Sequence, residues 1–108
     1  MPIRLNPTSL SAGAIAEAEL PTACRALATL VTESVEALAA LEAATDVQSC
    51  LDALIAHRRM GARVKRAEDR VLLLMNQAGA SPTGLGNALG INQLTVSRRL
   101  SAAKAETD

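Results

Sequence analysis

The sequence contains no phenylalanine, tyrosine or tryptophan, although apolar residues make up 49% of its 108 residues. A core in such a chain must be built from leucine, valine, isoleucine, methionine and many alanines. Alanine and leucine have the highest helix propensities, whereas strands are enriched in β-branched and aromatic residues. We therefore expect an all-α protein of single-domain length, with a modest core of a few helices.

Charge is divided unevenly along a chain whose net charge is zero. Residues 1–56 hold two basic and seven acidic side chains, and residues 57–108 hold nine basic and four acidic ones. This division suggests that the basic half faces a polyanion and that the acidic half supports it structurally. Two solvated faces that merely differ in sign would produce the same division.

Prolines, glycines and capping residues predict three segments. Residues 1–20 form an N-terminal arm and a short helix, capped by Ser9 or Ser11 and stopped by Pro21. Residues 21–60 form a helical hairpin with its loop near residue 45, where Asp46 caps the second helix. Gly61 is expected to bend or break the chain before a three-helix unit, residues 61–108, that has no wing.

An apolar stripe runs through the first hairpin helix from Leu20 to Leu41, at intervals of four and three residues, with a polar gap at Ser34. It is either the inner face of the hairpin or a dimer seam, because two thin helices without aromatic residues bury little area alone. Most soluble oligomers are two-fold, so we expect a homodimer. The expected interface residues are Leu27, Val31, Leu38, Leu41, Leu51, Leu54 and Ile55.

The stretch SPTGLGNALGINQLTVSRRL, residues 81–100, carries the signals of two short helices joined by a tight turn. Ser81-Pro82 is a helix start, Gly90 suits a left-handed helix end, and Asn92 suits the cap of the next helix. In that helix, residues 93–103, the periodicity predicts an apolar back and an opposite face that combines small polar residues with arginine. The apolar face holds Val96, Leu100 and Ala103, and the opposite face holds Leu94, Arg98 and Ser101.

Two other interpretations of this stretch are available. Gly84, Gly86 and Gly90 approach a dinucleotide-binding fingerprint, but that chemistry needs a strand before the glycines and a helix that begins among them. The glycines here fall inside or at the end of a short helix, so we set this interpretation aside. A helical corner that only packs would also show much of the pattern.

The stretch resembles the helix-turn-helix of bacterial and phage repressors and sigma-factor-like regulators, and the small actinobacterial type in particular. Six positions of the family pattern are present, namely Gly86, Leu89, Gly90, Ile91, Val96 and Leu100. The resemblance covers roughly residues 61–104, because the basic helix 62–78 matches the supporting helix of the family. Two positions depart from the pattern: the family usually has alanine at Gly86 and an apolar residue at Arg99.

The resemblance implies a recognition helix that begins at Asn92-Gln93 and enters the major groove. Base readout is then expected from Asn92, Gln93, Leu94, Ser97, Arg98 and Ser101. Phosphate contacts are expected from Thr83, Thr95, Arg99, Lys104, Arg63, Lys65 and Arg66. The function implied is that of a small dimeric transcriptional regulator that binds double-stranded DNA sequence-specifically.

Two alternative functions remain open at this stage. One is an antitoxin or adaptor whose N-terminal hairpin binds a partner protein, and the other is a nucleoid or partition protein that coats DNA with little sequence preference. An enzyme is not expected, because His57 is the one histidine and no acid–base or nucleophile set is visible.

Neither a cofactor nor a metal is expected, because Cys24 and Cys50 match no metal-binding spacing. Two cysteines that should not meet within one chain fit a reducing compartment. The apolar run 71–75 is too short to span a membrane, and no signal peptide is visible. We expect a cytoplasmic protein.

Overall fold

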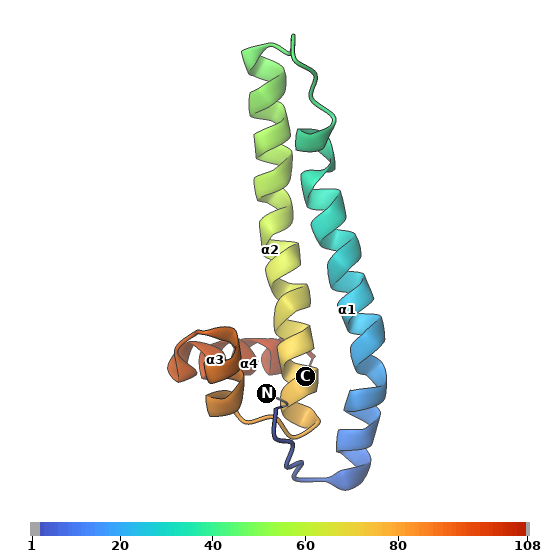
Figure 1. The fold of residues 1–108 in the computed structure, drawn as a ribbon, viewed down its shortest axis with the longest axis vertical. Coiled ribbons are helices and arrows are strands. Elements are labelled where there is room, and N and C mark those ends of the chain that lie inside the picture. The colour runs from blue at the N-terminus through green and yellow to red at the C-terminus, as the bar shows by residue number, and fades with distance from the viewer. Residues whose placement is uncertain (1–2, 108) are drawn as a thin grey trace.

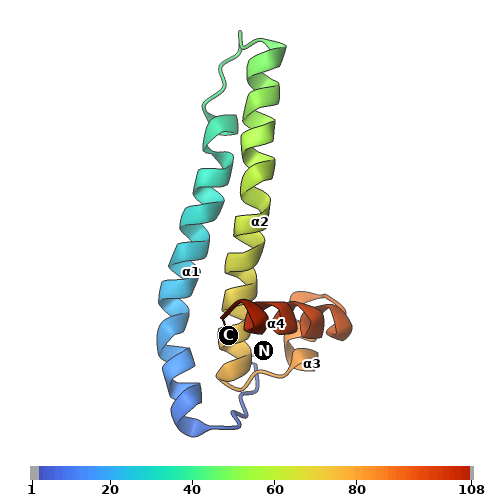
Figure 2. The same ribbon diagram turned by 180° about the vertical axis from the view of Figure 1, so that it is seen from behind.

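The computed structural model describes residues 3–107, and these residues fold into helices with no strand. The helices are α1 (Leu10–Ala39), α2 (Val47–Gln77), α3 (Pro82–Leu89) and α4 (Gln93–Thr107). Helices α1 and α2 form a long antiparallel hairpin, and α3 and α4 lie beside its base (Figures 1 and 2). The predicted all-α class is confirmed. Residues 1, 2 and 108, which belong to the expected arm and C-terminal unit, lie outside the described part of the chain.

Helix α1 does not stop at Pro21, so the predicted short helix ending at Leu20 is wrong. Ser9 caps the helix as expected, its hydroxyl accepting a hydrogen bond from the Ala12 amide at 3.3 Å. The chain then stays helical through Pro21 to Ala39. Proline removes one helical hydrogen bond and crowds the carbonyl four residues earlier, but Pro21 and Glu17 are both exposed, so water can solvate that carbonyl. Packing along α2 keeps the helix continuous.

Helix α2 is likewise continuous where the sequence predicted a break. Asp46 occupies the N-cap position, and the helix runs without interruption through Gly61 to Gln77. Gly61 is exposed, and a Cβ added there would meet nothing within 4 Å. Glycine lowers helix propensity by about 1 kcal/mol, which is too little to interrupt a helix of this length that is packed on α1. The expected hairpin and the expected supporting helix therefore share one rod.

The inner face of the hairpin agrees with the predicted stripe at five of its seven positions and differs at the other two. Ala23 and Leu30 are half-buried and Ser34 is buried, whereas Cys24 and Val31 of the predicted stripe are exposed. Small residues such as Ala16 and Ala53 bring the two helices together. Across this inner face the His57 ring lies 2.8 Å from the Ser34 carbonyl oxygen, at its Nδ1 atom. His57 is half-buried at this contact.

The seven residues expected in a dimer interface divide into two groups. Leu27, Leu38 and Leu41 are half-buried within the hairpin. The remaining four are 38–47% exposed, namely Val31, Leu51, Leu54 and Ile55. The two cysteines are unpaired and exposed.

A second core lies at the base of the molecule, where α3 and α4 pack on the lower half of α2. Leu72 and Leu73 of α2 are buried there with Leu85, Val96 and Leu100. The connection from α2 to α3 turns at Gly79, whose φ of 118° is in the range that glycine tolerates best. The N-terminal arm closes over this turn, because the Asn6 amide donates to the Gly79 carbonyl at 2.9 Å.

Candidate nucleic-acid interface

The turn between α3 and α4 has the local structure that the sequence predicted. The Ser81 hydroxyl accepts a hydrogen bond from the Gly84 amide at 3.0 Å, and Pro82 follows at the first helical position. Gly90 ends α3 in the left-handed conformation, with φ 72° and ψ 29°. Ile91 then packs against the core cluster as a partly buried plug. Together these residues set the start of α4 at a fixed angle to α3.

Helix α4 has a buried back and an exposed front. Val96 is fully buried, and Leu100 and Ala103 are 8% and 6% exposed. On the opposite side Gln93, Arg98 and Ser101 are exposed, and Leu94 is 65% exposed. The helix therefore presents polar side chains and one apolar side chain to solvent over three turns.

Two of the predicted readout residues are less available than their positions in the sequence suggested. The Asn92 side-chain oxygen accepts a hydrogen bond from the Leu94 amide at 2.7 Å, so it caps α4. The amide nitrogen of Asn92 is not used in this cap and can donate to a base, whereas the oxygen is held in place by the cap. Ser97 is half-buried at the edge of the front.

The close packing of α3 against the start of α4 leaves little room for a side chain at Gly86. A Cβ added to Gly86 would lie 2.8 Å from the Ile91 backbone oxygen, which is closer than a carbon and an oxygen normally approach. The Ile91 amide also donates to the Gly86 carbonyl at 3.0 Å. Glycine at position 86 therefore allows α3 and the start of α4 to approach this closely.

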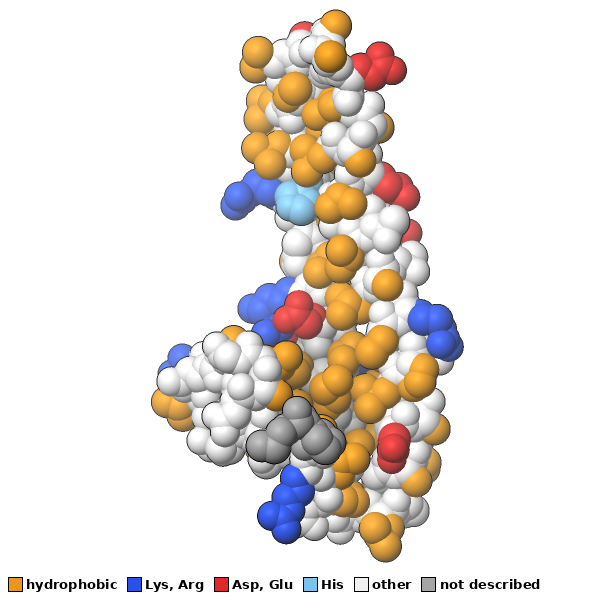
Figure 3. Space-filling view, viewed as in Figure 1, with side chains coloured by type: hydrophobic (Ala, Val, Ile, Leu, Met, Phe, Trp, Pro, Cys, Tyr) orange, Lys and Arg blue, Asp and Glu red, His pale blue; other side chains and the backbone are white. Residues whose placement is uncertain are grey.

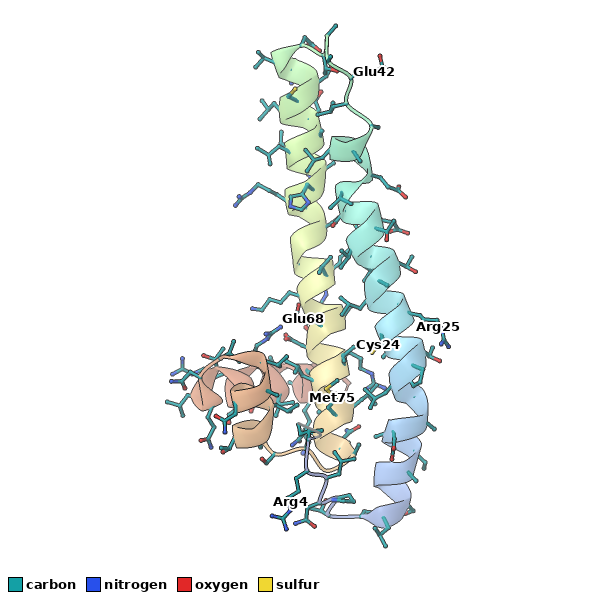
Figure 4. The ribbon with its side chains drawn as sticks, in the orientation of Figure 1. Arg4, Cys24, Arg25, Glu42, Glu68 and Met75 are labelled. Atoms are coloured by element: carbon teal, nitrogen blue, oxygen red, sulfur yellow. The ribbon has the colours of Figure 1, made fainter. Side chains whose placement is uncertain are left out.

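Arg99 joins α4 to α2 through two carboxylates. Its Nη2 donates to Glu68 at 2.8 Å and its Nε to Asp69 at 2.5 Å, and the Arg99 side chain is only 19% exposed. Partial burial works against the charge, but the hydrogen bonds and charges of the two carboxylates outweigh it and raise the pKa of Arg99. Glu68 projects from α2 beside the α3–α4 unit (Figure 4). Arg99 was predicted to contact phosphate, but the structure commits it to this contact, which we call the Arg99 clamp.

A groove of about 640 Å³ separates α4 from α2. Thr95, Arg98 and Arg99 line it from α4. Lys65 and Glu68 line it from α2, so three of the predicted cations and one carboxylate share this concave surface. Arg63 and Arg66 are exposed on α2 but do not line this groove. The structure thus brings Lys65 to α4 and leaves Arg63 and Arg66 outside.

The other predicted phosphate contacts lie at separate edges of the unit. Thr83 is exposed in the first turn of α3, where backbone amides favour an anion. Lys104 is exposed in the last turn of α4. Leu89, the last residue of α3 before the turn, is 54% exposed.

Sequence reasoning missed Glu68 and Asp69. One signal was available: Asp69 lies three residues before Leu72 and four before Leu73, on the side of α2 that is otherwise apolar and covered. A carboxylate on such a face requires a cationic or hydrogen-bonding partner. The residues around Asp69 in the sequence do not show which cation is its partner.

No protein-family model matches this chain, and neither the search of curated proteins nor that of solved structures finds a significant match. Within residues 3–107, no helix combines the length and apolar character needed to cross a membrane. The same residues contain no group of three or more histidine, cysteine or acidic side chains arranged to hold a metal ion.

Proposed function

We propose that this protein binds double-stranded DNA sequence-specifically, with α4 in the major groove, and acts as a small transcriptional regulator. The observation that carries the proposal is the two-sided character of α4 behind the left-handed turn at Gly90. Its apolar back is buried to 0% exposure at Val96, and its front presents Gln93, Arg98 and Ser101. A helix of this kind, supported by a second helix at a fixed angle, fits the dimensions of a major groove.

The groove between α2 and α4 supports a division of roles among the cations. Arg98 stands on the exposed front and also borders the groove, so its guanidinium can reach the guanine O6 and N7 edge. Lys65 and Thr95 lie further along the same groove, where a phosphodiester backbone flanking the bound major groove would pass. Contacts of that kind position a protein on DNA without reading sequence.

The first test is selection of binding sites from a pool of random duplexes by the purified full chain at moderate salt. We expect enrichment of one short motif. Binding to every duplex without enrichment would favour a protein that coats DNA. Absence of binding would contradict the proposal and leave the α3–α4 corner as packing alone.

A pair of arginine variants then tests the role given to α4. Arg98→Ala should lose preference at one base position of the selected site, at a cost of about 1–3 kcal/mol for that position. The matched control is Arg25→Ala, because Arg25 is exposed on α1 and should leave binding unchanged. Lys65→Ala should weaken all sequences alike and reduce the salt slope by about 1.

A further inference from the structure

The upper hairpin carries an open apolar surface on α2 that repeats a covered one lower down. Leu54 and Leu72 are 18 residues apart, which is about five helical turns, so they lie on the same side of α2. Ile55 stands in the same relation to Leu73. The lower pair is 4% exposed under α3 and α4, whereas Leu54 and Ile55 are 46% and 38% exposed. The upper side of α2 is built like a helix-packing face but has no helix on it.

Helix α1 extends this surface. Val31 and Val35 are 43% and 42% exposed, one turn apart, on the side of α1 adjacent to its inner stripe. Figure 3 shows hydrophobic side chains gathered on the upper hairpin over both α1 and α2. We call this surface the upper apolar face; its members are Val31, Val35, Val47, Leu51, Leu54 and Ile55, all of them exposed by 38% or more.

The amount of exposed surface favours a second copy of the chain as the occupant of this face. The chain exposes 7521 Å², compared with about 5,700 Å² for a compact monomer of its mass. Its radius of gyration is 17.1 Å, compared with about 13 Å for a compact chain of this length. A stable dimer buries about 800 Å² on each partner. The excess surface is therefore larger than the area that a second copy needs.

Charges at the border of the upper apolar face favour antiparallel pairing. The tip of the hairpin carries Glu42 (Figure 4) and, at the N-cap of α2, Asp46, while Arg58 lies below the face on α2. If the two-fold axis passes near Leu54, Asp46 of one copy lies about 12 Å above it, at the level of residue 62 of the other copy. An acidic tip then meets a basic mid-section. Parallel pairing would instead place the two acidic tips together.

We propose that a second copy of this chain docks on the upper apolar face in antiparallel orientation and forms a four-helix bundle with an α3–α4 unit towards each end. This inference is independent of DNA binding, because it rests on the exposed surface and charges of the hairpin. It adds to the proposed function by giving one particle two copies of α4.

Sedimentation equilibrium of the full chain, from micromolar to submillimolar concentration, tests the pairing. The wild type should be a dimer, and Val31→Glu should weaken the dimer by roughly 100-fold or more, because it buries an unpaired charge. Thr29→Glu is the matched control, since Thr29 is also β-branched and exposed but lies about 200° around α1 from Val31. Leu54→Glu should act like Val31→Glu.

Circular dichroism of each variant shows whether it is still helical, so that loss of pairing is not confused with loss of folding. A wild type that is monomeric over the whole range would overturn the proposal and leave the face to a protein of different sequence. A Val31→Glu and a Leu54→Glu protein that both pair as tightly as the control would overturn it as well.

Spin labels test the orientation. In a chain with Cys24 and Cys50 replaced by alanine, labels are placed at position 47 or position 54. Antiparallel pairing about Leu54 offsets the two labels at position 47 by about 20 Å along the helix axis, since each lies seven residues from the two-fold axis, and offsets those at position 54 hardly at all. The 47-to-47 distance should therefore be clearly longer than the 54-to-54 distance. Equal distances at the two positions would show that the helices pair in parallel.

Discussion

The lower and upper halves of α2 present similar leucine-rich sides to their surroundings, but only the lower half is covered within the chain. Leu72 is 4% exposed under α3 and α4, and Leu54, on the same side of the helix, is 46% exposed. The two halves differ in which other helices of the chain pack on them. Helices α3 and α4, joined by a tight turn and held by the Arg99 clamp, cover the lower half in addition to α1. The upper half packs against α1 alone. One helix cannot cover both the inner side and the outer side of another.

Substituting the two leucines separately should give the largest contrast. Leu72→Ala removes buried methyl groups from the lower core and should reduce the free energy of unfolding by about 2–5 kcal/mol. In dilute solution, where the chain is a monomer, Leu54→Ala should reduce it by less than about 1 kcal/mol. Urea titration of both variants measures this contrast. Similar losses in the monomer would show that the two halves do not differ in packing.

The Arg99 clamp should have the next largest effect. Asp69→Ala leaves Arg99 with Glu68 alone and should destabilise the protein by about 2 kcal/mol, less than for a fully buried pair because Arg99 retains some contact with water. Thermal unfolding measures the loss. Glu68→Ala is the control, because the Glu68 side chain is 51% exposed and should contribute less than about 1 kcal/mol. Equal effects of the two changes would contradict the assignment of Asp69 as the stronger partner.

Gly86→Ala tests how far the covering of the lower half depends on the tight α3–α4 turn. The new Cβ would approach the Ile91 backbone oxygen, and backbone moves less readily than a side chain end. We expect a loss of about 1–2 kcal/mol, in spite of the higher helix propensity of alanine. Chemical denaturation measures it. A variant more stable than wild type would mean that the turn opens to admit alanine.

Gly61→Ala should have the smallest effect and the opposite sign. Gly61 lies between the two halves of α2, inside a helix and with open space around it. Alanine there should raise the free energy of unfolding by about 0.5–1 kcal/mol. A shift of the melting temperature to higher values would agree with the rod seen in the structure. A decrease would indicate that the helix bends at Gly61 in solution.

Features set by neighbouring residues could be predicted from the sequence. The Ser9 and Ser81 caps, the left-handed turn at Gly90 and the buried position of Val96 all depend on residues within a few positions of one another. Short sequence motifs determine such local hydrogen bonds and backbone conformations. The same holds for the exposed front of α4, which follows from helical periodicity.

Features set by distant contacts could not be predicted in this way. Pro21 and Gly61 were expected to end helices, because intrinsic propensity disfavours both, but packing along the hairpin overrides propensity. The inner stripe moves by one residue at two positions only, from Cys24 to Ala23 and from Val31 to Leu30. Both residues of each pair lie near the inner face, and packing on α2 decides which of them is covered. The partner of Arg99 lies 30 residues earlier in the chain, beyond the reach of any local pattern.

The uninterrupted course of α2 has a mechanical consequence. Its 31 residues span about 46 Å, and a helix resists twisting because every turn is hydrogen-bonded to the next. A rotation imposed on the upper end is therefore transmitted along the shaft to Asp69, which holds Arg99 of α4. The upper apolar face and the contact that holds α4 therefore lie along one continuous helix.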